Sequence, residues 1–483
     1  MKRLLQFFSG RLVFLFLYFL PYQGPSPQGR VALAVFAWMV TWWMTQPVPW
    51  AILSLLPLLL FPAFSLMSIG KVSALYGQTI FFWIWGTVLM GYAMERHGLA
   101  NRFALWFLSR RLVAGNTLRL AFGFMLVTAL ISTMVSDAAT VAMMIPVGVS
   151  LVSFVRSVTG ATGKQRSRFG SFLALGTLYA AVAGGTATIA GIPHNALSVA
   201  LLEKFTGRTL GWFEWMKAGS LIFVATLVTF YLILRWFFPP EISSVPGGEE
   251  FLRREREKLG PLRPGERATL FVFAAMIVLF TLPTAIDWIF GRGHPLTQWS
   301  TTALSLYVVP QAIVLLLFCT PVNWRKGEFV LTWPEAVKQT PWNIMILCTA
   351  AAAVVDALVE FGFVKFAGDL ITGLGLGPIS LPFVAAAVVA ISTNFISGTA
   401  ATTFFGAILI PAAQQIGFNP ASMAMLISNA ALGIAMPWAG AAAATAFGSG
   451  ELDMKEMMQT GIVATLIFAF LVAAIHIPLS PFL

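Results

Sequence analysis

Two apolar segments of the chain are each interrupted by small polar residues of a kind that binds ions or small polar ligands. Residues 131–146 read ISTMVSDAATVAMMIP, and residues 391–407 read ISTNFISGTAATTFFGA. The central motifs are Ser136, Asp137 and Ala138 in the first segment and Ser397, Gly398 and Thr399 in the second. Hydroxyl and carboxylate oxygens bind cations, and hydroxyls also donate hydrogen bonds to anions. Backbone that leaves the helix at membrane depth must be buried in protein or line a watery cavity. The repeated interruption therefore points to a site near the bilayer midplane.

Asp137 is the ionisable residue of these motifs. An ionisable group at this depth is costly, and function is its default interpretation. Its carboxylate is able to hold a sodium ion or to take up a proton. The structural alternative is a carboxyl that caps the helix beginning at Ala138. A bare carboxylate repels a dianion, so a carrier of anions needs a cation or a proton at this position.

Other polar residues also have both a functional and a structural interpretation. His194 either senses pH or donates to an anion, or it is a satisfied histidine packed in a loop. The hydroxyls of the second motif either contact a ligand or cap a helix in a hairpin turn. Asp356 and Glu360 lie four residues apart on one predicted helix face. A helix end beside Lys365 explains these acids better than a catalytic pair.

The elements that must position these residues are predicted to be membrane-spanning helices. Of the 483 residues, 58% are hydrophobic and 10% are charged, and the mean hydropathy is +0.83. Apolar runs of about 20 residues recur along the chain, which is typical of an all-α polytopic membrane protein. Candidate spans lie near residues 11–21, 29–46, 49–64, 79–94, 171–190, 216–238, 268–284, 300–319, 342–358, 378–391, 421–437 and 458–478.

The net charge of +11 reflects basic loops and does not indicate nucleic-acid binding. Lys164, Arg166 and Arg168 share one loop, and six more basic residues lie between Arg253 and Arg267. Basic loops stay in the cytoplasm. We therefore expect a multi-pass protein of the cytoplasmic membrane, with the N-terminus inside, the C-terminus outside and an odd number of crossings.

The polar stretch 239–267 divides the chain into two halves, residues 1–238 and 268–483, which repeat the same order of features. Each half has an apolar–polar–apolar segment, which predicts a re-entrant hairpin near 116–155 and another near 378–416. A glycine-rich break follows each hairpin, at 183–195 and 436–450. The stretch 101–111 suits a helix lying in the membrane interface. An odd number of spans per half makes the copies inverted.

At these residues the chain resembles the divalent anion:sodium symporter family, whose hairpin tips carry Ser-Asn-Thr and whose breaks carry a Pro-Pro-Asn type loop. The resemblance extends over nearly the whole chain, through GYAMERHGLANRFAL, LTWPEAVKQTPWNIMIL and FGSGELDMKEMMQTGI among others. The chain departs from that pattern where Asp137 and Gly398 replace the tip asparagines, where Ile192 and His194 alter the first loop, and where residues 440–443 lack Pro-Pro-Asn.

The resemblance implies about eleven transmembrane helices plus two re-entrant hairpins in inverted repeats. It also implies a scaffold domain, a transport domain, an elevator motion and a homodimer. The substrate-binding residues carried over from the family are Ser136, Asp137, Ala138, Pro193, Asn195, Ser397, Gly398 and Thr399. The sodium-site residues are Ser132, Ser136, Asp137, Gly191, Thr393, Gly398 and Gly440.

The predicted function is secondary active transport of a small divalent anion, with C4-dicarboxylates ahead of sulfate or another oxyanion. Coupling to Na⁺, at the first site more than the second, coupling to a proton, and anion exchange without a cation all stay open. A membrane-embedded enzyme would need a cluster of acids or basic residues at one membrane face, which the sequence does not show. A channel would need no duplicated, interrupted site.

Overall fold

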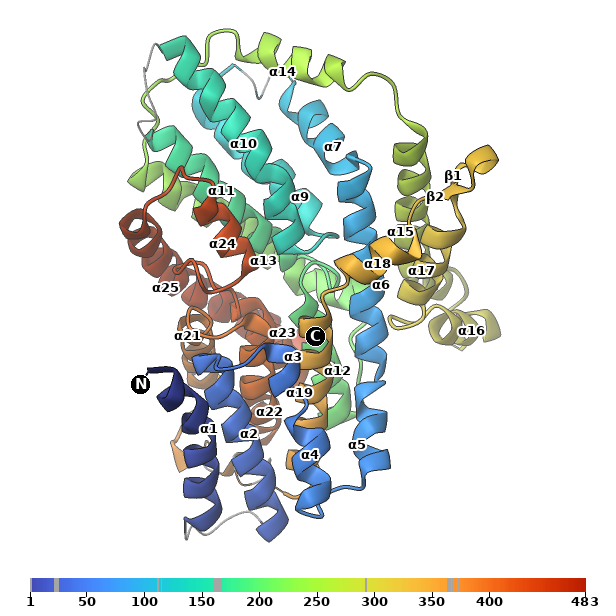
Figure 1. The fold of residues 1–483 in the computed structure, drawn as a ribbon, viewed down its shortest axis with the longest axis vertical. Helices are drawn as coiled ribbons and strands as arrows, with labels where there is room; N and C mark the ends of the chain where they lie inside the picture. The colour runs from blue at the N-terminus through green and yellow to red at the C-terminus, as the bar shows by residue number, and fades with distance from the viewer. Residues whose placement is uncertain are drawn as a thin grey trace.

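The structure, a computed structural model, describes residues 2–20, 26–110, 113, 115–159, 167–291, 293–362, 366, 368–369, 371 and 373–483. The first half contains α1 (Lys2–Phe19), α2 (Pro27–Thr45), α3 (Trp50–Leu53), α4 (Leu56–Ala63), α5 (Ile69–Tyr76), α6 (Thr79–Arg96), α7 (Leu99–Leu108), α9 (Thr117–Ser132), α10 (Asp137–Thr159), α11 (Arg168–Gly185), α12 (Pro193–Thr206) and α13 (Trp212–Phe237). All of the regular elements described in this half are helices (Figure 1).

The second half follows the connecting helix α14 (Gly248–Lys258). It contains α15 (Pro264–Phe290), α16 (Pro295–Ala303), α17 (Val309–Cys319), α18 (Trp333–Gln339), α19 (Trp342–Glu360), α21 (Ser380–Ser392), α22 (Gly398–Gln415), α23 (Pro420–Ala430), α24 (Ala441–Gly448) and α25 (Met454–Leu479). Short 3₁₀ turns lie at Trp324–Lys326 and Ser480–Phe482. The strands β1 (Pro321–Asn323) and β2 (Glu328–Phe329) form a small antiparallel hairpin between α17 and α18.

Six helical stretches of the described chain are long and apolar enough to cross a membrane. They are Ile69–Arg96, Asp137–Val158, Trp212–Phe237, Pro264–Phe290, Trp342–Glu360 and Met454–Phe482. Shorter apolar helices include Thr117–Ser132 and Ser380–Ser392. These two are the first arms of the interrupted segments, and helices of that length suit re-entrant hairpins.

The two halves repeat the same succession of elements. A helical hairpin (α9–α10 or α21–α22) is followed by a helix, an irregular break and a second helix (α11–α12 or α23–α24), and then by a long helix (α13 or α25). The hairpin α9–α10 occupies the end of the molecule toward α14, and α21–α22 occupies the opposite end (Figure 1). The expected all-α fold with two hairpins in inverted repeats is therefore confirmed.

The halves interlock at their breaks. The helix α12 of the first half packs on α22 and α23 of the second half. The helix α24 of the second half packs on α10 and α11 of the first half. A small residue allows this close packing: a Cβ at Gly406 of α22 would lie 2.7 Å from Cδ1 of Leu201 on α12. The hairpin tips are thereby brought to the middle of the molecule.

Two of the spans predicted from the sequence are each two helices in the structure, so the prediction of a single helix is wrong there. The span at 49–64 is split between α3 and α4, and the span at 300–319 is split between α16 and α17. Pro57 and Pro310 lie in the first turns of α4 and α17. A proline has no N–H to donate to the carbonyl four residues before it, so a helix tends to restart there.

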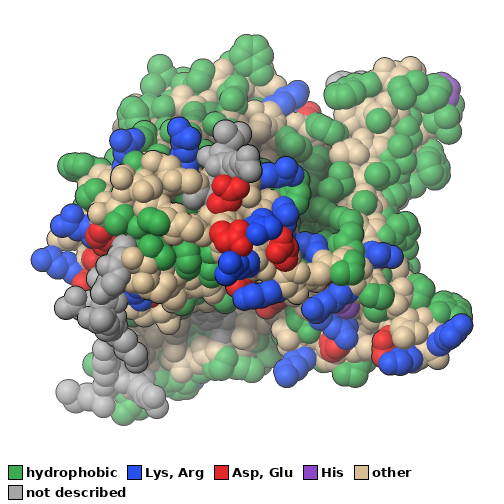
Figure 2. Space-filling model, turned by 90° about the horizontal axis from the view of Figure 1, so that it is seen from above, with side chains coloured by type: hydrophobic (Ala, Val, Ile, Leu, Met, Phe, Trp, Pro, Cys, Tyr) green, Lys and Arg blue, Asp and Glu red, His purple; other side chains and the backbone are tan. Residues whose placement is uncertain are grey.

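The polar linker contains the helix α14, an exposed and strongly charged element. Glu250 accepts hydrogen bonds from Arg253 and Arg254, and these bonds lower the pKa of its carboxyl. Charged side chains of both signs gather over this end of the molecule (Figure 2). The segment is consequently suited to water or lipid headgroups and not to the bilayer core.

Candidate functional site

The tip of the first hairpin is a short turn between α9 and α10. α9 ends at Ser132, whose Oγ donates to the carbonyl of Ala181 on α11 at 2.6 Å. α10 begins at Asp137, whose Oδ1 accepts from the N–H of Ala138 at 2.8 Å. The Oγ of Ser136 lies 3.5 Å from the N–H of Ala139, in the position of a weak N-cap. The structural role foreseen for Asp137 is thus present, and it occupies one carboxylate oxygen.

The tip of the second hairpin has the same plan. The Oγ of Ser397 accepts from the N–H of Ala400 at 3.2 Å and caps α22. Asn394, which the sequence analysis did not single out, accepts from the N–H of Ala435 at 2.8 Å and donates to the carbonyl of Ala390 at 2.9 Å. This buried amide ties the tip to the second break. Its only signal in the sequence is an asparagine inside an apolar run.

Asn195, which the resemblance assigns to substrate binding, is hydrogen-bonded within the protein. It is fully buried, and its Nδ2 donates to the carbonyls of Gly185 and Thr188, each at 2.8 Å. Its Oδ1 accepts from the hydroxyl of Ser428 at 2.7 Å. All of these partners belong to the first break or to α23. Because both the nitrogen and the oxygen of this amide are hydrogen-bonded within the protein, Asn195 stabilises the first break. It is not one of the residues that line the cavity between the hairpin tips.

One cavity of about 410 Å³ brings the two hairpin tips and the two breaks together. The predicted site residues that line it are Ser136, Asp137, Ala138, Pro193, Ser397, Gly398, Thr399 and Gly440. Ser132, Gly191, Asn195 and Thr393 are not among its lining residues. Ser132 and Thr393 are fully buried next to the tips. The lining of this cavity thus combines residues from both halves of the chain.

The charge of this cavity is unusual for an anion site. Asp137 and Glu95 contribute carboxyl groups, and none of the described lining residues is a lysine or an arginine. The hydrogen-bond donors on the wall include the three tip hydroxyls, His194 and Gln339. Glu95 and Gln339 were not foreseen, because they come from α6 and α18, which only the tertiary fold places beside the tips. A bound anion needs compensation by a cation or a proton here.

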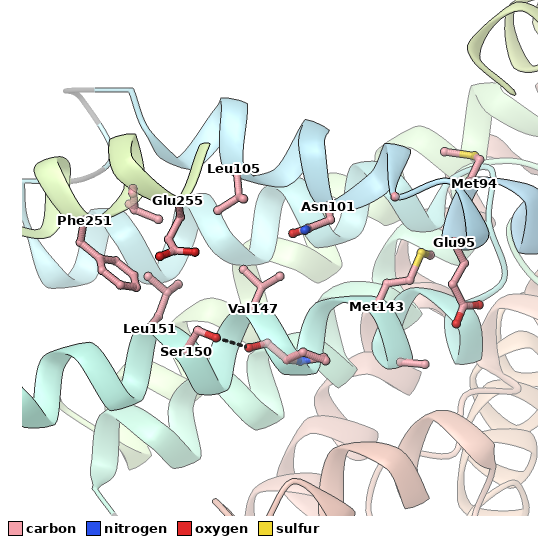
Figure 3. Close-up of a pocket in the computed structure, with 14 residues that line it drawn as sticks. Met94, Glu95, Asn101, Leu105, Met143, Val147, Ser150, Leu151, Phe251 and Glu255 are labelled. Atoms are coloured by element: carbon pink, nitrogen blue, oxygen red, sulfur yellow. Dashed lines mark hydrogen bonds between the residues drawn. The ribbon is translucent and has the colours of Figure 1, made fainter. Parts of the chain in front are cut away.

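A second cavity of about 390 Å³ shares Glu95 with the first. It lies between α6, α7, α10 and α14, and Glu255 and Phe251 of α14 line its far end (Figure 3). Glu95, in the last turn of α6, lies at the opposite end of this cavity from Phe251, beside Met143 of α10 (Figure 3). The two cavities together extend from the linker helix to the hairpin tips.

The residues around the first tip have oxygens suited to a sodium ion. The hydroxyl of Ser132 gives its proton to Ala181, which leaves its lone pairs for a cation. Asp137 adds a carboxylate, and Ser136 adds a further hydroxyl. The hydroxyl of Thr393 likewise donates to the carbonyl of Ala390 at 2.9 Å, but the second tip has no acid. Among the described residues no group of three or more His, Cys, Asp or Glu side chains is arranged to hold a metal, so hydroxyls and backbone carbonyls must complete any such site.

The paired acids of α19 have separate partners. Glu360 forms an ion pair of 2.6 Å with Lys71 of α5, and Asp356 forms one with Lys204 of α12. Lys365, named as their neighbour from the sequence, lies outside the described residues. Both contacts make these acids structural ion-pair partners, of Lys71 and Lys204, which the sequence did not indicate.

Comparison with known proteins shows the family of this chain. Residues 1–479 match the family model described as "Sodium:sulfate symporter transmembrane region". The chain belongs to this family. Two relatives are the sodium-dependent dicarboxylate transporters SdcS of Staphylococcus aureus strains RF122 and MRSA252, each 29% identical. The alignments cover 96% and 98% of this chain and 88% and 90% of those relatives. The chain is thus a multi-pass membrane protein of a transporter family.

Solved structures agree on the fold. The YdaH transporter of Alcanivorax borkumensis has a TM-score of 0.56 and 12% identity, with 86% of this chain and 87% of that chain covered. MtrF of Neisseria gonorrhoeae has a TM-score of 0.52 and 11% identity, with 97% of both chains covered. At such identities the likeness concerns the architecture alone.

Proposed function

We propose that this member of the family is a secondary active transporter that carries small divalent anions, C4-dicarboxylates first, across the cytoplasmic membrane together with sodium. The observation that carries the proposal is the single cavity at which both hairpin tips meet. Ser136, Ser397 and Thr399 line it with hydroxyls from opposite halves of the fold. Its volume of about 410 Å³ is within the range of small-molecule sites.

The substrate's two ends meet donors from the two halves. Hydroxyls of the second tip donate to one carboxylate of the anion, and the hydroxyl of the first tip donates to the other. Hydrogen bonds to charged groups are stronger than those between neutral groups, so a few hydroxyls suffice for recognition. No lysine or arginine is required when a cation travels with the anion.

Sodium binding at the first tip resolves the conflict between Asp137 and an anion. Ser132, Ser136, Asp137 and the backbone of Gly191 would hold the ion there, and the ion would neutralise the carboxylate next to the substrate. Thr393, Gly398 and Gly440 form the weaker second site, because they supply no charge. We therefore propose one dominant coupled sodium ion. The sodium-dependent relatives support sodium coupling in general.

The movement proposed is an elevator motion of the interlocked unit formed by the hairpins, α11–α12 and α23–α24. This unit would slide against α2–α6 and α15–α19 in a homodimer. We further propose that the N-terminus and the α14 linker face the cytoplasm and the C-terminus faces outside. The basic residues of 253–267 support this orientation, because basic loops are retained on the cytoplasmic side.

Uptake by proteoliposomes tests the function. Purified protein is reconstituted, and radiolabelled succinate and sulfate are supplied with sodium or potassium outside, at two pH values. We expect succinate accumulation that requires an inward sodium gradient, with trans-stimulation by internal succinate. Sulfate is the second candidate, because the family's description names it. Accumulation of neither anion under any gradient, together with no counterflow, would contradict the proposal.

A further inference from the structure

We infer that a groove between α7 and the junction of α14 with α15 binds an anionic phospholipid, with the headgroup phosphate beside Arg256 and an acyl chain along the apolar walls. The groove has a volume of about 520 Å³. It shares no lining residue with the cavity at the hairpin tips. The inference therefore goes beyond the proposed transport function and does not depend on which anion is carried.

The walls of the groove are apolar side chains that remain exposed. Phe103 and Trp106 of α7 are 38% and 45% exposed, and their rings stack with centroids 5.9 Å apart. Leu262, between α14 and α15, and Leu270 of α15 line the other side and are 37% and 43% exposed. Because α15 is apolar enough to cross a membrane, the groove opens beside lipid chains. Apolar surface of this kind gains from leaving water for an acyl chain.

Arg102 joins the two walls and fixes the shape of the groove. Its Nε and Nη2 donate to the carboxylate of Glu266 at 2.8 and 2.9 Å. Its Nη1 donates to the carbonyl of Gly260 at 2.8 Å, and Nη2 also donates to the carbonyl of Leu259 at 3.1 Å. Since its nitrogens are engaged within the protein and its charge is matched by Glu266, Arg102 is a structural residue of the groove and does not recruit the ligand.

Arg256 is the cationic side chain of the lining that no carboxylate of the described residues neutralises. Its Nη1 donates to the hydroxyl of Ser109, a neutral partner, at 3.2 Å. Glu257, the acid of the lining, is paired instead with Arg253 at 3.1 Å. Arginine binds phosphate through two parallel hydrogen bonds from its planar guanidinium. Arg256 at the edge of an apolar groove is therefore suited to a lipid phosphate.

A second positive charge lies at the same end of α7. Arg110 directly follows Ser109, and its guanidinium lies 4.5 Å from the centre of the Trp106 ring. Basic residues near an anionic lipid surface add to the attraction one by one. A protein partner would need a surface that is both acidic and apolar to fill this groove, whereas an anionic phospholipid combines the two features in one molecule. Charge and polarity together thus favour the lipid.

The test measures lipid retention by the full-length protein in a neutral detergent. Native mass spectrometry counts adducts of phosphatidylglycerol and of phosphatidylcholine with the same acyl chains, and thermal unfolding is followed in the same titrations. Arg256→Gln removes the charge and keeps a donor for Ser109, and Trp106→Ala removes part of one apolar wall. Arg254→Gln is the matched control, because it makes the same change of net charge on α14 at an exposed residue outside the groove.

We expect the wild type to bind phosphatidylglycerol about fivefold more tightly than phosphatidylcholine, because one basic side chain near an anionic headgroup supplies about that factor. Arg256→Gln should lose this preference and Arg254→Gln should keep it. Trp106→Ala should bind both lipids more weakly. All three variants should unfold, without added lipid, at temperatures close to that of the wild type.

Three outcomes would overturn the inference: no lipid preference in the wild type, equal losses in Arg254→Gln and Arg256→Gln, or displacement of the lipid by glycerol phosphate, which has no acyl chain. A changed oligomeric state in Trp106→Ala with unaltered lipid retention would assign the groove to a contact between copies of the chain, and would also overturn it. Succinate uptake is a separate measurement, so the proposed function stands or falls independently.

Discussion

Asp137 carries a charge of the same sign as the proposed substrate, so its role is open to a direct test. Asp137→Asn keeps an oxygen ligand and the contact with the N–H of Ala138, but removes the charge. We expect sodium-dependent succinate uptake to persist with the apparent sodium affinity lowered about tenfold, equivalent to about 1.4 kcal/mol. The Hill slope for sodium should be near one in the wild type.

The control for Asp137→Asn is Glu328→Gln, which removes an exposed acid on β2. An unaltered sodium dependence in Asp137→Asn would remove this residue from the coupling site. A wild-type Hill slope well above one would show that several sodium ions are coupled. If uptake follows pH and loses that dependence in Asp137→Asn, the coupled ion is a proton.

Thr399 offers the cleanest test of substrate contact, because valine has nearly the same shape without the hydroxyl. A lost hydrogen bond to a charged group is worth about 1.5–3 kcal/mol. We expect Thr399→Val to weaken the apparent affinity for succinate by about tenfold or more while folding is retained. Thr445→Val on α24, whose hydroxyl donates to the carbonyl of Ala441, is the matched control. Equal affinities of Thr399→Val and wild type would take Thr399 out of the site.

At the scale of residues, sequence reasoning succeeded where a polar group interrupts an apolar run. Ser136, Asp137, Ser397 and Thr399 were recognised for that reason, and all four line one cavity. Glu95 escaped notice because it lies in an ordinary helix end, and its proximity to the tips depends on packing between α6 and α10. No local pattern encodes a contact of that kind.

The breaks that follow the hairpins are elements without regular backbone, and they depend on side-chain amides for their shape. Asn195 joins the first break to α23 through three hydrogen bonds. Asn195→Ala would leave two carbonyls and a hydroxyl without this partner, and each buried unpaired group costs about 1–3 kcal/mol. We expect a lowered unfolding temperature and reduced yield of folded protein, measured by thermal unfolding in detergent.

Asn101→Ala, which changes an asparagine on the wall of the second cavity, serves as the control for Asn195→Ala. A stable Asn195→Ala protein that has lost only substrate affinity would instead favour the direct contact carried over from the family.

The order of elements was predictable because hydrophobic runs and glycine-rich breaks are visible in the sequence. The ends of helices within long apolar runs were not, since the runs at 49–64 and 300–319 contain breaks that hydrophobicity alone does not reveal. Proline at positions 57 and 310 carried that information. A helix ends near these prolines because a proline has no N–H to donate to the carbonyl four residues before it. Average hydrophobicity does not report this property of the backbone.

At the scale of the whole molecule, the last turn of α12 contacts α19 and the connection between α16 and α17, which we assign to the scaffold. Lys204 pairs with Asp356 of α19, and the hydroxyl of Tyr307 donates to Glu203 at 3.0 Å. An elevator motion would have to break these contacts. Lys204→Met should therefore shift the population away from this conformation by about fivefold, since an ion pair of this exposure contributes about 1 kcal/mol.

The shift is measured by labelling a cysteine at Gln339 with a membrane-impermeant thiol reagent, in a background with Cys319→Ser. Lys71→Met is the matched control, because it breaks an ion pair of α19 with α5, which we place in the same rigid unit. If both substitutions alter the labelling equally, the Lys204 pair does not lie across a moving boundary.

The interlocking of α12 with α22–α23, and of α24 with α10–α11, also has a consequence for how the protein is made. The ribosome delivers the first half to the membrane before the helices that cover α12 have been synthesised. Until then the first half lies in the bilayer with the surface of α12 uncovered and the first break without its partners from the second half. Expressed alone, each half should be recognised by quality-control proteases and degraded. Expressed together from a gene cut within 239–247, ahead of α14, the halves should find each other and restore uptake, which immunoblotting and transport assays would reveal.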